Sequence, residues 1–511
     1  MTAAVGWVAF VLIGGAALAL LVAPSMRRRP VLLVAVAPAA AFALSMLAAM
    51  ALDLVGLGPW PGVAIIQAAV VVGAVARLAM LRSSDSTSTG PAHTAAPDAG
   101  PEEHRQRRLA GWLLGTAVLL TLAVWIVPGS PSVPKNRDVQ NHAYFVARIA
   151  HENSIDPAVV LAESPTSDER VADFYPLAAH STMATAQRAT GADIADMLVV
   201  WVVMSTAIAL PCGLFALARR LVPDRRAVAG WAALAGACTA LFPYQPMVWG
   251  GIAFTIGLSL VPGVLALALV AVDRGGRRPV PLLVLAAVAV TGAAMVHTSQ
   301  AALLALVMGA FLLHDLLARQ GRSGDVGAGP AVRWGALAAM CAVLLTPVAL
   351  GVPGTAERAS HEETLAEGPA EVVWRVLAFD VDAGPTQLLM GALALAGIAV
   401  AVAARRTRPL RRLGAFLAVM GVIRVVVRRP DAQRARGGGS ASWLGAVVPE
   451  LVADALQPGP VRSPVRGDRA GCAAQGCHLQ DGNPAAPRLG RDRHRRPSRG
   501  VHSSLDARGT G

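Results

Sequence analysis

Apolar blocks of about twenty residues recur along most of this chain, and they constrain its fold more than any other feature. A helix of that length spans the ~30 Å of hydrocarbon in a bilayer, and its backbone groups must be satisfied within the segment. The blocks are too long and too continuously apolar for the strands of a membrane barrel. With 54% hydrophobic and 15% charged residues among 511, the sequence predicts an all-α, polytopic membrane protein. We expect about 11–12 transmembrane helices.

Arginines gather in the connections on one predicted side of the membrane. The first block, Val5–Ala23, has no basic residue before it and is followed at once by Arg27, Arg28 and Arg29. Because cytoplasmic loops carry the excess of Lys and Arg, this block predicts a helix with its N-terminus outside the plasma membrane, and not a cleavable signal peptide. The arginine clusters agree with the direction of the later blocks, which are 31–52, 63–81, 109–127, 194–217, 228–249, 252–272, 280–296, 301–317, 334–350, 388–404 and 413–427.

Composition divides the chain into four regions. Residues 1–81 form an N-terminal three-helix membrane unit. Residues 82–108 are rich in Ser, Thr, Pro and Ala, which predicts a disordered cytoplasmic linker. A membrane core extends over 109–423, and its two outer loops are described below. Residues 424–511 form a low-complexity tail rich in Arg, Gly and Pro.

The tail explains most of the net charge of +13, because it carries fifteen Arg against seven acidic residues. This location removes the charge as an indication of nucleic-acid binding. Lys135 is the one lysine among 45 basic residues, which is typical of a GC-rich gene. A shifted reading frame in such a gene yields this kind of text without early stops. We interpret the tail as the product of a frameshift near Gly421–Gly439, and a genuine disordered basic tail is the alternative.

The five cysteines predict neither a disulfide framework nor a redox site. Cys212, Cys238 and Cys341 fall inside apolar blocks, where small packing residues are expected. Cys472 and Cys477 lack the spacing of a zinc site. The sequence therefore predicts no metal ligands and identifies no cofactor, and a divalent metal stays an open alternative.

The first outer loop, residues 128–193, gathers the ionisable side chains that are the main candidates for chemistry. Asp138 precedes VQNHAYFVARIA, whose apolar residues recur at helical spacing, a pattern typical of an amphipathic helix on the membrane surface. A second surface helix is predicted from Pro176 to Gly191, with His180 one turn inside it. Each residue has a structural alternative: Asp138 as a helix N-cap and His180 as a hydrogen-bonded interfacial side chain.

The predicted topology brings further candidates to the same face of the membrane. His297 ends a helix there, and the second outer loop, residues 352–386, contains His361 followed by two glutamates. Such groups provide a general base or bind phosphate, although a shared face is weaker support than a shared pocket. Beside Asp138, the candidates for substrate binding are Arg137, His142, Arg148, Tyr175, His180, Arg188, His297, Glu362 and Glu363.

The order of these features is similar to the first outer loop of GT-C-type glycosyltransferases. A helix crosses outward, and a short spacer, an acidic residue and two surface helices follow before the next span. More closely, RDVQNHAYFVARI followed by FYPLAAHSTMA resembles a family of uncharacterised polytopic proteins of high-GC bacteria. The resemblance covers roughly residues 109–420.

The resemblance implies that Asp138 is the catalytic base of a hexosyl- or pentosyltransferase. The sugar would move from a polyprenyl-phosphate donor to a cell-envelope glycan on the outer face, and Arg137, Arg148 and Arg188 are local candidates to bind the leaving phosphate. Val139 follows Asp138 where many such enzymes have paired acids, which puts a metal-dependent version in doubt. The expected partners are membrane lipids, the lipid-linked sugar and envelope polysaccharide, and no nucleic acid.

Two other classes of function stay open. A transporter or flippase would place ionisable groups inside its spans, near the bilayer midplane. We interpret this sequence as placing almost none there. A non-catalytic scaffold for envelope assembly is the other alternative, because each candidate residue also has a structural explanation.

Overall fold

The computed structural model describes residues 1–87, 100–126, 137–161, 176–223, 225–238, 244, 250–273, 280–320 and 329–350. Within these ranges every regular element is a helix, and eight helices are long and apolar enough to cross a membrane. The prediction of an all-α polytopic membrane protein is confirmed. The predicted spans 388–404 and 413–427, the second outer loop and the tail lie outside the described residues.

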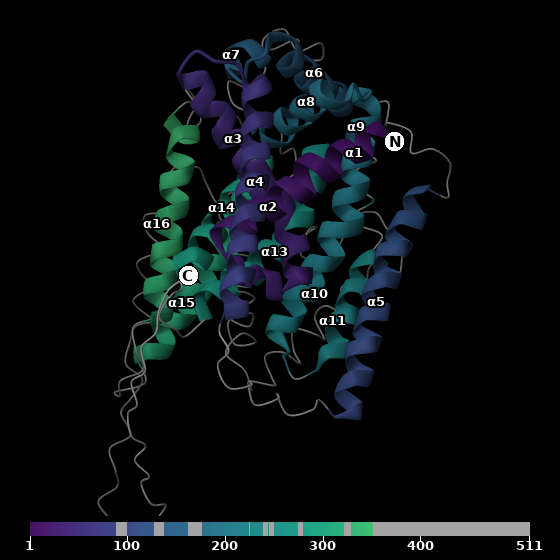
Figure 1. Cartoon of the computed structure of the whole chain (residues 1–511), viewed down its shortest axis with the longest axis vertical. Helices are drawn as coiled ribbons and strands as arrows, with labels where there is room; N and C mark the ends of the chain where they lie inside the picture. Colours follow the sequence, from purple (N-terminus) through teal and green to yellow (C-terminus); the bar gives the residue numbers. More distant parts are fainter. Residues whose placement is uncertain are drawn as a thin grey trace, which may run out of the picture. The chain divides into compact units, whose positions relative to one another are not determined.

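The N-terminal part of the chain folds into three long helical stretches (Figure 1). Proline stands at the first position of the second and third stretches, where its missing N–H would have no partner within the helix. The elements are α1 (Thr2–Gly6), η1 (Trp7–Ile13), α2 (Gly14–Val22), η2 (Pro24–Arg28), α3 (Pro30–Leu54) and α4 (Pro59–Thr87).

The second part begins with α5 (Pro101–Ile126), continues through short helices and returns to long apolar ones. These further elements are α6 (Arg137–Glu152), α7 (Pro157–Val160), α8 (Ala178–Thr190), α9 (Ile194–Met204), η3 (Ser205–Ala209), α10 (Leu210–Leu221), α11 (Arg226–Ala237), α13 (Ile252–Asp273), α14 (Val280–Val296), α15 (Thr298–Gln320) and α16 (Gly329–Leu350).

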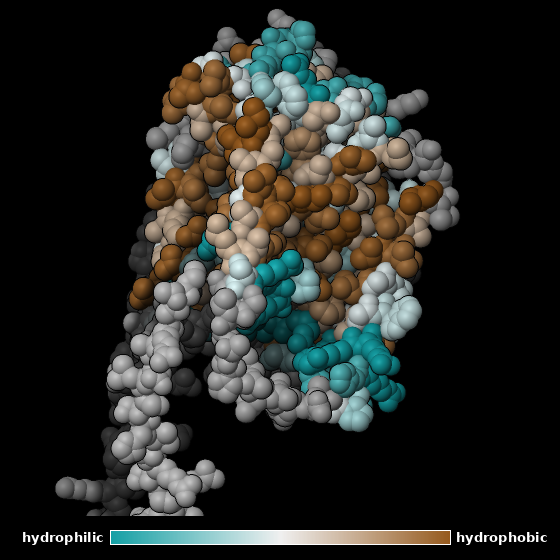
Figure 2. Space-filling view, viewed as in Figure 1, coloured by the Kyte–Doolittle hydropathy of each residue, from teal (hydrophilic) through white to brown (hydrophobic). Residues whose placement is uncertain are grey.

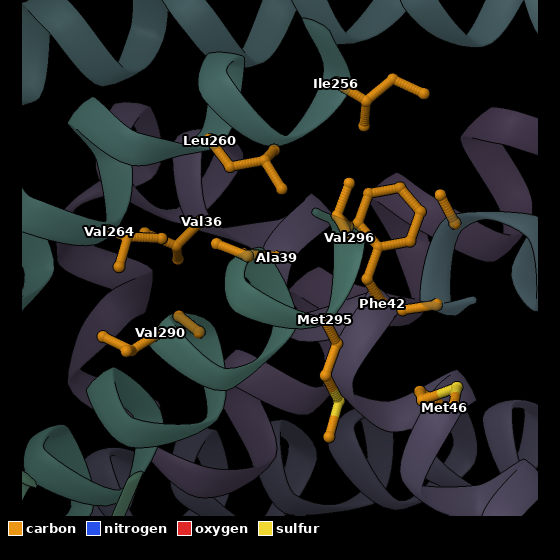
Figure 3. Packing of buried hydrophobic residues seen from close by; sticks show 14 of the residues in the cluster. Val36, Ala39, Phe42, Met46, Ile256, Leu260, Val264, Val290, Met295 and Val296 are labelled. Atoms are coloured by element: carbon orange, nitrogen blue, oxygen red, sulfur yellow. The ribbon is translucent and has the colours of Figure 1, made fainter. Parts of the chain in front are cut away.

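Helix α3 lies against α2, α10, α13 and α14, in the interior of the bundle. Glycine makes this packing close: a Cβ atom on Gly292 of α14 would overlap the backbone carbonyl of Ala39, and one on Gly263 of α13 would lie 2.8 Å from the carbonyl oxygen of Ala35. Phe42 of α3 and Val296 of α14 belong to the side-chain cluster at this junction (Figure 3). Helix α3 of the predicted N-terminal unit therefore packs directly against α13 and α14 of the predicted membrane core.

Helices also enter both ends of the segment interpreted as a linker, residues 82–108. Helix α4 continues to Thr87, and α5 begins at Pro101. In α5, Glu103 pairs with Arg107 at 2.7 Å one turn later, and it also pairs with Arg226 of α11. A first-turn acid and an i,i+4 ion pair both favour helix formation, which explains why the helix starts before the apolar block.

Polar side chains gather at the two ends of the bundle, with an apolar band between them on the face shown in Figure 2. One end carries α6 and α8. At the other end, Arg220 of α10 pairs with Asp273 of α13 at 2.7 Å. The arginine pattern predicts that the α6/α8 end faces outward.

Replacing Gly292 by Leu should destabilise the protein by at least about 3 kcal/mol, since the added side chain would meet backbone that cannot move aside. Gly111→Leu on α5 is the matched control, because a Cβ there meets nothing within 4 Å. Thermal unfolding in detergent would measure both variants. Equal stability of the two would contradict the close α3–α14 approach.

The predicted orientation is tested by single cysteines in intact cells. A membrane-impermeant maleimide should label a cysteine at Gln140 on α6 and should not label one at Gln106 on α5. Labelling of the Gln106 position alone would reverse the orientation.

Candidate functional site

Two short helices, α6 and α8, form the candidate site, and both lie where the sequence predicts helices. Helix α8 is not the surface helix that was expected, because its residues Ala178–Ala186 are all buried. Helix α6 buries Val139, Phe145, Val146 and Ile149, each 3% exposed or less. Their spacing puts them on one face of the helix. Helix α8 ends at Gly191, whose φ of 67° forms a left-handed C-cap.

The two helices run parallel to each other. Near their N-terminal ends His142 contacts His180, and near their C-terminal ends Arg188 donates to the carbonyl oxygen of Ala150 at 2.9 Å. Both contacts join residues 38 positions apart in the chain. One register therefore aligns α6 and α8 over about two turns.

The histidine pair is buried between these helices. His142 is 2% exposed and His180 is 1% exposed, and Nδ1 of His142 lies 2.8 Å from Nε2 of His180. The two rings stack with centroids 5.1 Å apart, and the ring of Phe145 meets His180 edge-on at 5.5 Å. Aromatic packing thus fixes the rings that the hydrogen bond joins.

Asp138 connects this buried pair to the surface. Its Oδ2 atom lies 3.5 Å from Nε2 of His142, and its side chain is 42% exposed. A continuous line of contacts therefore runs from an accessible carboxylate through His142 to the enclosed imidazole of His180.

Burial lowers the pKa of His180 well below its ordinary value, and the charges of His142 and His297 lower that pKa further. A hydrogen bond to the backbone of Pro176 acts in the opposite direction. His180 is therefore neutral near pH 7. A neutral imidazole has one N–H donor and one acceptor nitrogen, so one of the two rings donates and the other accepts across the 2.8 Å contact between Nδ1 of His142 and Nε2 of His180.

His297 joins the same electrostatic environment from the connection between α14 and α15. Burial lowers its pKa, the charge of His142 lowers it further, and the charge of Asp138 raises it. Its Nδ1 atom lies 2.8 Å from Oγ of Ser299, and its ring meets Phe254 of α13 edge-on at 5.5 Å. The structure thus gathers Asp138, His142, His180 and His297, which the sequence placed only on a common face.

Of the three arginines predicted to bind phosphate, Arg148 and Arg188 have described side chains, and both lie farther along the helices than the histidines. Arg148 pairs with Glu152 at 3.0 Å, and Arg188 holds the carbonyl of Ala150. They stand about 9 Å and about 12 Å from the histidines along their helix axes. The side chain of Arg137 lies outside the described residues, and so do Tyr175, Glu362 and Glu363 in full.

Asp138 is not the N-cap that the sequence offered as its alternative role. Helix α6 begins at Arg137, so Asp138 stands in the first turn. Its side chain contacts His142 one turn later. The genuine cap of this type in the region is Asp193, whose Oδ1 accepts from the backbone N–H of Ala195 at 2.9 Å.

Several residues around the cluster did not stand out in the sequence as site residues. Phe145 and Phe254 were hidden among other apolar residues, whereas Gln300, 1% exposed, stood out as a polar residue beside His297. Asp315 lies fully buried in α15 and accepts from Nε1 of Trp334 at 3.1 Å. Asp315 stands next to the end of the span Ser299–Leu316, so the interpretation that almost no ionisable group lies near the midplane of a span stays a prediction. The pair HD inside FLLHDLLA was the signal for this residue in the sequence.

The described residues contain no group of three or more His, Cys, Asp or Glu side chains arranged to hold a metal ion. In the histidine pair one ring nitrogen faces the other at hydrogen-bond distance. The arrangement is suited to proton transfer, because an accessible acid–base group is coupled to a second one in a dry environment.

Comparison with known proteins gives one match. Residues 8–438 match a family of unknown function, DUF6541. No curated protein and no solved structure matches the chain. The match includes the three N-terminal helices, and it ends inside the range 421–439 in which the sequence analysis places a frameshift. The origin of the tail stays a prediction.

The neutral state of His180 predicts a pH-dependent stability. Because the unfolded histidine has a pKa near 6.5 and the folded one a lower pKa, the unfolded state binds the proton first as the pH falls. The contribution of His180 to the free energy of unfolding is fully present above about pH 6.5. Below that pH it falls by up to about 1.4 kcal/mol per pH unit.

His180→Gln should flatten this dependence between about pH 7 and pH 5, as measured by thermal unfolding. His151→Gln, at an exposed position of α6, should leave it unchanged. An unaltered slope in the His180 variant would contradict the neutral assignment.

Proposed function

This chain belongs to the DUF6541 family, whose function is unknown, and we propose that it is a membrane enzyme that transfers a sugar at the α6/α8 end of its bundle. The donor in this proposal is a polyprenyl-phosphate sugar and the acceptor is a glycan of the cell envelope. The observation that carries the proposal is the contact of the accessible Asp138 carboxylate with the buried His142–His180 pair.

Asp138 is the proposed general base. Its carboxylate takes the proton of an acceptor hydroxyl while that oxygen attacks the anomeric carbon of the donor. The bond between the anomeric carbon and the phosphate oxygen breaks, and the phosphate leaves with the electron pair. The exposed fraction of the Asp138 side chain, 42%, supports this role, because a base must reach the substrate.

His142 and His180 are positioning residues in this proposal. His142 lies between the two groups, with Nε2 at 3.5 Å from Oδ2 of Asp138 and Nδ1 at 2.8 Å from Nε2 of His180. Its ring is held in place by burial and by the contact with His180. The histidines then orient one carboxylate oxygen and leave the other for the acceptor.

The leaving phosphate needs a positive or hydrogen-bonding group nearby. Arg148 and Arg188 are engaged with Glu152 and with the backbone of Ala150, so we assign this role to Arg137, next to Asp138 in the chain. His297 is the second group, because it shares the environment of Asp138 and His142.

The order of elements supports sugar transfer as the reaction class. Helix α5 is a candidate span, residues 127–136 follow, and Asp138 then stands in the first turn of α6, the first of the two helices that precede the next span at Ile194. This is the order that resembles GT-C-type enzymes. The position of the site at the end of the apolar band also suits a substrate whose head group emerges from the membrane.

Transport is the alternative that one observation favours. Asp315 is a fully buried carboxylate inside a candidate membrane span, and such residues often lie on ion pathways. However, the stretch of α15 from Ser299 to Leu313 contains no ionisable residue. Asp315 therefore lies about 25 Å along α15 from the end of the helix beside His297. The transfer reaction therefore explains more of the arrangement.

Asp138→Asn should reduce the rate of sugar transfer by about 10²–10⁴, because the amide cannot accept the proton. Asp193→Asn is the matched control: it makes the same exchange at a capping position, where Asn serves about as well as Asp. Transfer from a radiolabelled lipid-linked sugar in membranes would measure both.

The stability of Asp138→Asn should stay within about 1 kcal/mol of the unmodified protein, the size of a first-turn charge interaction. Full activity of this variant would refute Asp138 as the base. Attention would then move to Glu362 and Glu363.

A further inference from the structure

A cavity of about 320 Å³ lies among α14, α15 and α16. Its walls are built of apolar side chains, from Ala301 at one end to Leu312 and Trp334 at the other. The stretch of α15 from Ala301 to Leu312 is about 16 Å long. We call this cavity the α15/α16 groove.

Small residues form two rows along the groove. On α15 the row is Ala301, Ala305 and Gly309, and on α16 Ala338 and Ala342 stand four positions apart. Residues four apart lie on one helix face, and rows of this kind allow close approach of another transmembrane helix. A Cβ atom on Gly309 would meet nothing within 4 Å, so no described residue uses this approach.

The faces that other helices expose are different in kind. On α4 the exposed residues include Ile65, Val72 and Met80, and on α5 they include Trp112 and Leu119. Large apolar side chains are what lipid tails contact, whereas small ones are enriched where helices pack. The groove therefore has the composition of an unfilled helix-packing surface.

The chain itself supplies a segment of matching chemistry. The described residues end at Leu350, on the helix that forms one wall of the groove. The next apolar block, Leu388–Ala404, reads LLMGALALAGIAVAVAA and contains no charged residue. It pairs small residues at four-residue spacing, Ala392 with Ala396 and Gly397 with Ala401.

The direction of the block also fits. Helix α15 starts beside His297, at the end of the bundle that carries the candidate site, and α16 returns toward that end. Because residues 352–386 are predicted to lie outside, the block Leu388–Ala404 would approach the groove from that end. It would then leave at the opposite end, where Arg405 and Arg406 follow the block. That is the end at which Arg220 also stands.

We propose that the α15/α16 groove is the seat of the chain's own segment Leu388–Ala404, which packs there as a further membrane helix. The segment runs parallel to α15 and antiparallel to α16, with its small residues against Gly309 and Ala338. A second copy of the chain and a lipid tail are the competing occupants.

The test uses the native thiol of Cys341, which lines the groove and is 8% exposed. In a full-length chain whose other cysteines are replaced by Ser, single cysteines are placed in turn from Gly391 to Ala401. Oxidative cross-linking within one chain should recur every three to four positions. A protease site inserted between residues 351 and 387 would reveal a cross-link within one chain. After cleavage, the two linked fragments stay together on a gel until the disulfide is reduced.

The control replaces Cys341 by Ser and moves the wall cysteine to Val343, which is 70% exposed and does not line the groove. This set should show no periodic pattern. Cross-links between two chains would assign the groove to a second copy, and uniformly absent cross-links would assign it to lipid. Either result overturns the proposal.

A pair of glycine variants tests the same proposal without cysteines. A Cβ atom on Gly309 and one on Gly115 of α5 both meet nothing within 4 Å, but only Gly309 lines the groove. Gly309→Leu should lower the apparent Tm by several degrees, and Gly115→Leu should not lower it. Equal Tm values would contradict a helix seated on Gly309.

Discussion

Close approach of helix backbones is the interaction on which the rest of this bundle depends. Lipid tails are as apolar as leucine, so burial alone gives little drive for one membrane helix to join another. Close van der Waals contact through small residues stabilises the association instead. Helix α3 makes several such contacts, because Gly292 of α14 and Gly263 of α13 bring their backbones against the carbonyl groups of α3. This explains why the three N-terminal helices are part of the core.

Helices α6 and α8 depend on that core in turn. Helix α8 contacts α3 and α1, and Gly6 of α1 brings its backbone toward Ala186. Helix α6 packs against α8, and His142 and His180 are buried between the two helices. In such surroundings a charge is costly and a hydrogen bond is strong. The same burial that stabilises the pair therefore sets its protonation state.

The sequence was informative where one rule dominates. Apolar length and arginine placement predict the spans, and Pro176 with Gly191 delimits α8 because both residues restrict the backbone. What the sequence could not provide was distance: His142 and His180 are 38 positions apart, and only the parallel arrangement of α6 and α8 makes them neighbours. Asp138 was ambiguous for a similar reason, since its role depends on where the helix starts. Asp315 was missed because one acid hardly changes the hydropathy of a long apolar block.

The two contacts between α6 and α8 both join residues 38 positions apart, so the helices are parallel. The geometry of the site therefore does not depend on the exact length of the segment that joins them. Parallel helices need a connection that returns along their length, here about 24 Å for the 16 residues of α6. About eight extended residues cover that distance, and residues 153–177 exceed it. Each doubling of a flexible connection adds only about 0.6 kcal/mol to its closure. The contacts between α6 and α8, and not the length of the connection, therefore set the histidine register.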